Sequence, residues 1–121
     1  MKLRILALLT TLLASSSAWA SDMKSHHGGR MAEAGEYHVE MVAKGEVVEI
    51  YLADHDNKAV SAVGHKAVAI LVIYGKSQRI VLEPAGDTKL SGKASSALPA
   101  SAKGVVQITP PKGKTVQARF N

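Results

Sequence analysis

From residue 36 to the end of the chain, short apolar runs alternate with clusters of turn-forming residues. This pattern constrains the fold more than any other feature of the sequence. Residues 37–41 alternate apolar and polar side chains, which is typical of a strand with one buried face. Residues 47–52 repeat that pattern after a Lys44-Gly45 turn. The remaining runs that we interpret as strands are residues 60–63, 67–74, 78–83, 90–95, 105–109 and 116–120.

Seven or eight strands at this spacing are typical of an all-β sandwich or barrel. We expect an antiparallel β-sandwich over residues 36–121, with a core mainly of Val, Ile, Leu and Ala because aromatic residues are few. Residues 67–74 are apolar throughout, so periodicity alone leaves a helix open there. That run is short and ends at Gly75, which favours a buried strand.

The first twenty residues have the pattern of a secretion signal. Lys2 and Arg4 precede a short apolar run, and Ala18-Trp19-Ala20 is a small-residue cleavage site. We therefore expect residues 1–20 to be a signal peptide and the mature protein to be periplasmic. Residues 21–35 have no usable periodicity and are predicted to form a flexible arm. No later segment approaches the length of a membrane span, so none is expected in the mature chain.

Composition limits the chemistry that the chain can perform. Without Lys2 and Arg4 the chain has 13 basic and 10 acidic residues, and this net charge of +3 is too scattered to indicate a nucleic-acid partner. The absence of cysteine excludes thiol chemistry and cysteine-bound zinc. No nucleophile motif, phosphate loop or carboxylate pair stands out, so we expect no enzyme.

The arm carries the residues that best suit a metal ion. His26, His27 and Met31 lie close together, with Met23 just before them. Imidazole suits copper and zinc, and a thioether suits copper(I) in a compartment that oxidises thiols. Copper is therefore the favoured ion and zinc the alternative. The competing interpretation is a solvated linker that binds nothing.

The other histidines are weaker candidates. His38 lies on the polar face of its strand and is expected to point outward, where the arm could fold back onto it; Met41 on the opposite face is expected in the core. His55 stands between Asp54 and Asp56, either as a carboxylate–imidazole metal site or in a turn whose aspartates cap backbone amides. His65 is expected to be a surface residue.

Four segments together resemble a known group of proteins. They are His-Gly-Gly from residue 27, Tyr-His-Val-Glu-Met from residue 37, Tyr-Leu-Ala-Asp-His-Asp-Asn-Lys-Ala-Val from residue 51, and Leu-Glu-Pro-Ala-Gly-Asp-Thr-Lys-Leu from residue 82. They are similar to small secreted bacterial proteins, and to segments of heavy-metal efflux adaptors, whose β domain is immunoglobulin-like and of the YtkA/FixH type. The resemblance covers roughly residues 28–121 and implies an immunoglobulin-like sandwich, periplasmic metal handling, and His27, His38 and His55 as candidate ligands. No helical hairpin or lipoyl-like part is present, so this chain cannot itself be an adaptor.

Two hypotheses follow from the sequence. The first is a metal-binding protein, with copper favoured, that sequesters the ion or delivers it to a periplasmic component of an efflux system. Its candidate ligands are His26, His27, Met31, His38 and His55. The second is an immunoglobulin-like interaction module of the cell envelope that binds no metal. The sequence leaves the oligomeric state open.

Overall fold

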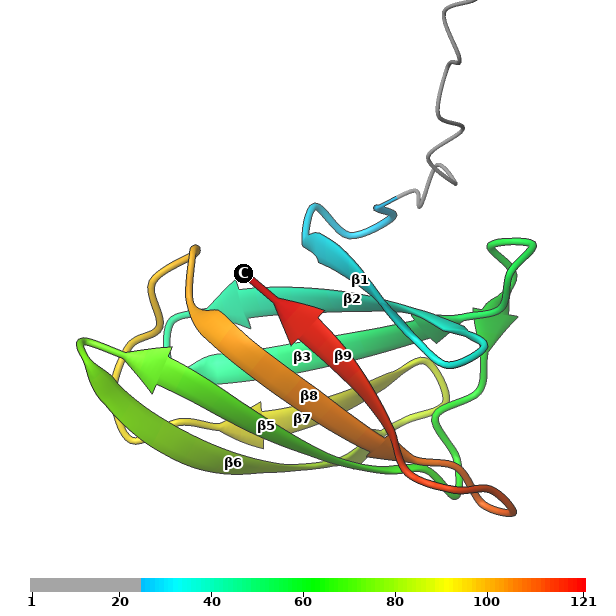
Figure 1. Cartoon of the computed structure of the whole chain (residues 1–121). Coiled ribbons are helices and arrows are strands. Elements are labelled where there is room, and N and C mark those ends of the chain that lie inside the picture. Colours follow the sequence, from blue (N-terminus) through cyan, green and yellow to red (C-terminus); the bar gives the residue numbers. More distant parts are fainter. Residues whose placement is uncertain (1–24) are drawn as a thin grey trace, which may run out of the picture.

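A computed structural model describes residues 25–121, and every regular element in that range is a β-strand (Figure 1). Nine strands follow one another along the chain, and all of their pairings are antiparallel. Their bounds are β1 Arg30–Ala34, β2 Tyr37–Lys44, β3 Val47–Ala53, β4 Ala59–Val60, β5 Lys66–Ile73, β6 Lys76–Ala85, β7 Lys89–Lys93, β8 Lys103–Thr109 and β9 Val116–Phe120.

The strands form one sheet in the order β1-β2-β3-β7-β6-β5-β8-β9, and the short β4 pairs with β3. The ten-residue strand β6 joins the two halves of this path, because its first part pairs with β5 and residues 83–85 pair with β7. The first and last strands of this path, β1 and β9, pack beside each other, so the sheet nearly closes into a barrel (Figure 1).

Arg30 stabilises the contact between β1 and the C-terminal end of the path. Its Nη2 donates a hydrogen bond of 2.6 Å to the backbone oxygen of Asn121, and its guanidinium lies 5.7 Å from the ring centroid of Phe120. Its Nη1 donates to the backbone oxygen of Ala102, just before β8. The planar guanidinium can serve several acceptors and an aromatic face at once, so one side chain ties β1 to the far end of the path.

The core lies inside the curled sheet and is aliphatic, as the composition predicts. Its largest fully buried side chains come from six different strands: Val39, Val48, Ile50, Leu71, Ile73, Leu82, Leu90, Val106 and Ile108. Met41 is 5% exposed and belongs to this cluster, which confirms its predicted place. Close packing of so many branched side chains supplies the main driving force for the fold.

The all-β antiparallel prediction is confirmed, and so is the strand favoured over a helix for residues 67–74, since β5 covers Lys66–Ile73. The predicted flexible arm of residues 21–35 is wrong in its last part, since residues 30–34 pair with β2 as strand β1. The proposed signal peptide, residues 1–20, and Met23 lie outside the described residues. Within residues 25–121, no helix is long and apolar enough to cross a membrane.

Candidate functional site

The candidate site lies on the outer face of β2 and β3, away from the core. Val39 and Met41 of β2 point into the core, so His38 and Glu40 between them point to the opposite side. Each of these two polar residues is nevertheless only 3% exposed. The expectation that His38 would be exposed is therefore wrong. Alternation along a strand fixes the face of a side chain but not what covers that face.

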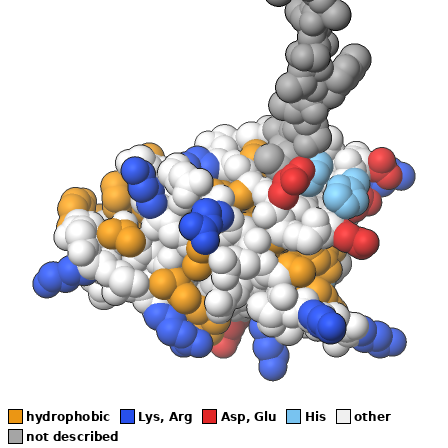
Figure 2. Space-filling model, viewed as in Figure 1, with side chains coloured by type: hydrophobic (Ala, Val, Ile, Leu, Met, Phe, Trp, Pro, Cys, Tyr) orange, Lys and Arg blue, Asp and Glu red, His pale blue; other side chains and the backbone are white. Residues whose placement is uncertain are grey.

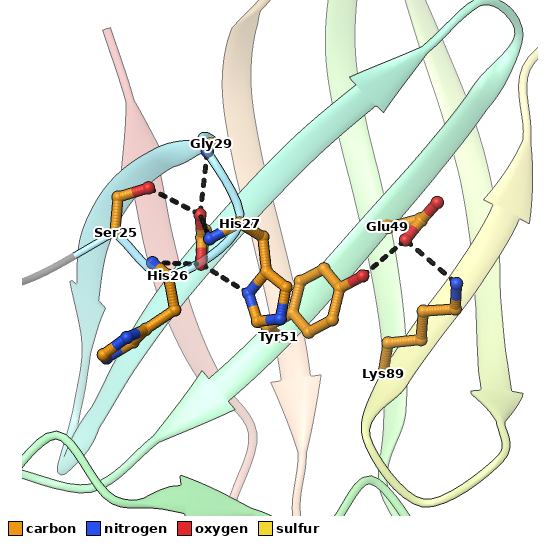
Figure 3. Close-up of polar contacts among 8 residues, drawn as sticks. Ser25, His26, His27, Gly29, Glu49, Tyr51 and Lys89 are labelled. Atoms are coloured by element: carbon orange, nitrogen blue, oxygen red, sulfur yellow. Dashed lines mark hydrogen bonds and ion pairs between the residues drawn. The ribbon is translucent and has the colours of Figure 1, made fainter.

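The cover over Glu40 is the segment of residues 25–29, which folds over the Glu40 carboxylate (Figure 3). Five hydrogen bonds converge on the two carboxylate oxygens. The donors are Ser25 Oγ at 2.7 Å, the backbone N–H groups of His26, His27 and Gly29 at 3.2, 3.0 and 2.8 Å, and the His27 ring at 2.9 Å. We call residues 25–29 the clasp.

The clasp holds Glu40 in its ionised form. Burial by itself would raise the pKa of this carboxyl group, because the charged form loses water. The hydrogen bonds from Ser25, from the His27 ring and from the backbone amides of Gly29 and His27 outweigh that effect and lower the pKa to about 2. A carboxylate at the centre of five donors is therefore a fixed negative charge on this face.

Two glycines allow the clasp to lie flat on β2. A Cβ atom on Gly29 would stand 2.5 Å from the backbone oxygen of Met41 and 2.9 Å from Cγ of Glu40. Only a glycine can approach the strand this closely. Gly28 has a φ of +73° and open space around its Cα, so it supplies the left-handed turn without a close contact.

His27 joins the clasp to β3. Its Nδ1 contacts Glu40, and its ring stacks on the ring of Tyr51, with centroids 3.5 Å apart and planes 10° from parallel (Figure 3). The Tyr51 hydroxyl donates a 2.7 Å hydrogen bond to buried Glu49. That bond, with burial and the negative charges of Glu49 and Glu40, raises the pKa of Tyr51 to about 12.

The negative charge of Glu49 is balanced by two lysines. Lys89 Nζ lies 3.1 Å from one of its oxygens and Lys44 Nζ lies 3.5 Å from the other. The hydrogen bond from Tyr51 lowers the pKa of Glu49 against the effect of burial, and the two lysines lower it further. The outer face of β2 and β3 thus carries two buried carboxylates, each satisfied by its own set of donors.

His38 has a separate set of neighbours. Its Nδ1 lies 2.9 Å from Asn57 Oδ1, while its Nε2 is 3.8 Å from Glu33 Oε1, which is too far for a hydrogen bond. The His55 ring meets it edge-on at 5.7 Å between centroids. The loop that carries Asn57 and His55 is closed by Asp54, whose Oδ1 accepts the N–H groups of residues 56 and 58. The capping role predicted for this turn is therefore confirmed for Asp54.

These elements surround a cavity of about 290 Å³. Four of the five predicted ligands line it, namely His26, His27, Met31 and His38. The remaining wall is formed by Glu40, Tyr51, Leu52, Ala53, Asn57, Ala59 and Thr88. His55 is exposed, contacts the His38 ring edge-on and does not line the cavity. Within residues 25–121, no group of three or more His, Asp or Glu side chains is placed to hold a metal ion.

His65 differs from its expected surface position. It is 6% exposed, its Nε2 lies 3.3 Å from the Tyr37 hydroxyl, and its Nδ1 has no hydrogen-bond partner among the described residues. Sequence reasoning also missed Glu40, Tyr51 and Asn57 as parts of the site. The available signal was weak: a Glu on the polar face of an otherwise apolar strand gives no hint of the backbone amides that will cover it.

Comparisons with family models, with curated proteins and with solved structures find no match to this chain, so none of them connects it to the YtkA/FixH-type domains.

Proposed function

We propose that this protein binds a soft or borderline metal ion, with copper favoured and zinc as the alternative, in the cavity between the clasp, β1, β2 and the Asn57 loop. The observation that carries the proposal is that three imidazoles and one thioether, from His26, His27, His38 and Met31, line one cavity. These four residues lie within a stretch of thirteen residues, and all four line the same cavity.

The hydrogen bond at His27 supports this role. Glu40 is ionised and can only accept, so His27 Nδ1 is the donor of the 2.9 Å contact. The neutral ring then carries its lone pair on Nε2. A carboxylate that holds the far nitrogen of a histidine is the usual outer partner of a metal-bound imidazole. Glu40 therefore orients His27 rather than binding the ion.

His38 is oriented in the same way by a neutral group. Asn57 Oδ1 accepts from His38 Nδ1, which leaves the Nε2 lone pair without a hydrogen bond among the described contacts. In both rings Nε2 therefore carries the lone pair that can bind a metal ion. The left-handed backbone of Asn57, with a φ of +61°, is a conformation that asparagine tolerates well.

Met31 decides which ion is favoured. It lies on β1 directly opposite Glu40 of β2, and its side chain contributes to the cavity wall. A thioether suits copper(I), whereas zinc prefers imidazole, thiolate and carboxylate. Since no set of three His, Asp or Glu is preformed within residues 25–121, binding here requires Met31 or a shift of His26 on the exposed side of the clasp.

The cellular setting forms part of the same proposal. Export to the periplasm is proposed from the signal-peptide pattern of residues 1–20. An immunoglobulin-like relationship of the β domain, and sequestration of the ion or its transfer to an efflux component, are proposed from the sequence resemblance. The chain acts without catalysis in this scheme, because its task is to hold and release an ion.

The test is a titration of the purified protein with copper(I), copper(II) and zinc(II), followed by NMR at the histidine rings and methionine methyl groups. We expect stoichiometric shifts at His27, His38 and Met31 with copper(I). Met31→Leu should weaken copper(I) binding at least tenfold, and Met41→Leu is the matched control because that thioether is buried in the core. Binding that is equally strong in both variants, or weak shifts spread over all histidines, would overturn the proposal.

A further inference from the structure

The outer face of β5, β6, β8 and β9 combines exposed aliphatic and basic side chains. The strand register places Arg79, Ile70, Val105 and Arg119 in one row across the four strands. The row on one side adds Val81 and Val68 and continues through Gln107 and Gln117, and the row on the other side adds Val72 and Lys103 beside Ser77. Directly opposed residues of antiparallel strands point to the same side, so these residues form one surface. We call it the basic–aliphatic face.

Two of its valines are unusually exposed. Val72 is 48% and Val81 is 53% accessible, while Val68, Ile70 and Val105 beside them are partly covered. Val81 lies directly opposite Val68, and Val72 lies four residues further along β5, with Ile70 between. A single exposed apolar residue needs no explanation, but an apolar strip that continues across adjacent strands indicates an interaction surface. Figure 2 shows hydrophobic and basic side chains interspersed over much of the visible surface, whereas the histidines gather with acidic residues near the clasp end.

Basic side chains outnumber acidic ones on this face. The outward positions of the four strands carry the basic residues Lys66, Arg79, Lys103 and Arg119 and, as their only acid, Glu83. Among residues 25–121, no ion pair joins any of the four basic side chains to an acid. An anionic partner therefore gains their attraction without first breaking an internal pair.

The shape of the face indicates what kind of anion fits. Strand β5 is paired on both sides, by β6 and β8, so a peptide could not add to it as a further strand. Contacts must come from side chains alone. A hollow of about 490 Å³ at one end is lined by residues that include Lys66, Arg79, Val68 and Val81, together with the acid Glu83. Cations beside aliphatic side chains suit a phosphate headgroup next to acyl chains.

We infer that the basic–aliphatic face docks on an anionic phospholipid surface. Arg79 and Arg119 contact lipid phosphates, and the exposed valines enter the boundary between headgroups and acyl chains. This face belongs to β5, β6, β8 and β9, whereas the clasp cavity is lined by residues of the clasp, β1, β2, β3, β4 and nearby loops. The two surfaces share no residue, so docking does not use the residues that line the cavity. The inference does not rest on metal binding.

The experiment is co-sedimentation of the purified protein, with its N-terminus determined by mass spectrometry, with two kinds of vesicle. One kind contains phosphatidylglycerol in phosphatidylcholine, and the other contains phosphatidylcholine alone. We expect binding only to the anionic vesicles, with an affinity that falls as salt is raised. The double variant Arg79→Gln/Arg119→Gln should bind roughly 30-fold more weakly, since each cation near such a surface contributes about a factor of five.

A matched double variant, Lys112→Gln/Lys114→Gln, removes the same charge from the exposed loop between β8 and β9 and should retain most of the binding. Val72→Ser/Val81→Ser should weaken binding without changing net charge. Equal losses in the arginine and lysine variants, or no binding to anionic vesicles, would overturn the inference. Binding to soluble polyglutamate but not to vesicles would also overturn it and indicate an acidic protein partner.

Discussion

His27 and Tyr51 stack face to face, with ring centroids 3.5 Å apart and only 10° between their planes. One residue belongs to the clasp and the other to β3, so this contact joins a segment next to the undescribed N-terminus to the central sheet. Each ring is also held at its far end by a carboxylate, Glu40 for His27 and Glu49 for Tyr51. The position of the candidate ligand His27 is thereby determined by two strands at once.

Replacing Tyr51 separates the two roles of its side chain. Tyr51→Phe keeps the stack and removes the hydrogen bond to buried Glu49, which should lower the free energy of unfolding by about 1–3 kcal/mol. Tyr51→Leu should cost a further ~1 kcal/mol because the aromatic contact is lost as well.

The same hydroxyl can be followed by its ultraviolet absorbance. One of the three tyrosines should ionise only as the pH approaches about 12, and Tyr51→Phe should remove that late transition. Because the folded-state pKa lies above the ordinary value of 10.0, this contribution to stability is complete below pH 10 and is lost as the pH rises through about 12. Identical titration curves for the two proteins would contradict the assignment.

The hydrogen bonds of the site predict the tautomers of two histidines. In mildly alkaline solution, nitrogen-15 NMR should show the proton on Nδ1 of both His27 and His38, with Nε2 unprotonated. Glu40→Gln should disturb only the first ring and Asn57→Ala only the second. Exposed His55 serves as an internal reference for a ring without such an acceptor. A proton found on Nε2 of either ring would show that its lone pair is not aimed at the cavity.

The two clasp glycines allow a matched test of how closely the clasp backbone approaches β2. Gly29→Ala places a methyl group 2.5 Å from a backbone oxygen, so the clasp must lift and lose its bonds to Glu40. Gly28→Ala costs only about 1 kcal/mol for a left-handed backbone, because no atom lies within 4 Å of the added carbon. Amide hydrogen exchange at His27 and residue 29 should be fast in the first variant and nearly unchanged in the second. Equal protection in both would show that the clasp tolerates a side chain at position 29.

The all-β class and seven of the nine strands could be predicted from the sequence, because alternation and turn residues mark those strands to within three residues at each end. Strand β1 was missed since its residues, Arg-Met-Ala-Glu-Ala, include no β-branched side chain and favour helices by propensity. It forms a strand because β2 offers an open edge. The single path of the sheet depends on β6 pairing with two neighbours, and local patterns carry no information on such a choice.

The candidate site was only half predictable. The residue types that suit a metal ion are visible in the sequence, and four of the five chosen residues line one cavity. The groups that orient them were not visible, because Glu40 acts through backbone amides of the clasp and Asn57 acts through a loop conformation. Backbone donors have no sequence signature. The arrangement of such donors around a buried carboxylate becomes apparent only in three dimensions.

Acidification should release the clasp within a defined pH window. The Glu40 pKa falls from an ordinary 4.5 to about 2 in the folded protein, so its contribution to stability is present above pH 4.5 and is lost as the pH falls towards 2. The full shift corresponds to at most about 3–4 kcal/mol. Denaturant unfolding across this window, with the amide shift of Gly29 as a local reporter, should show the loss directly.

The Glu40→Gln variant tests whether Glu40 causes the loss of stability between pH 4.5 and about 2. The variant should be less stable at neutral pH, because an amide cannot accept all five hydrogen bonds, and should lose most of the clasp's pH response. A smaller slope of the same sign should remain, since Glu49 also has a lowered pKa. Exposed Glu83→Gln is the matched control and should behave like the unmodified protein. A Glu40→Gln protein that kept the original slope and the protected Gly29 amide would show that the carboxylate does not hold the clasp.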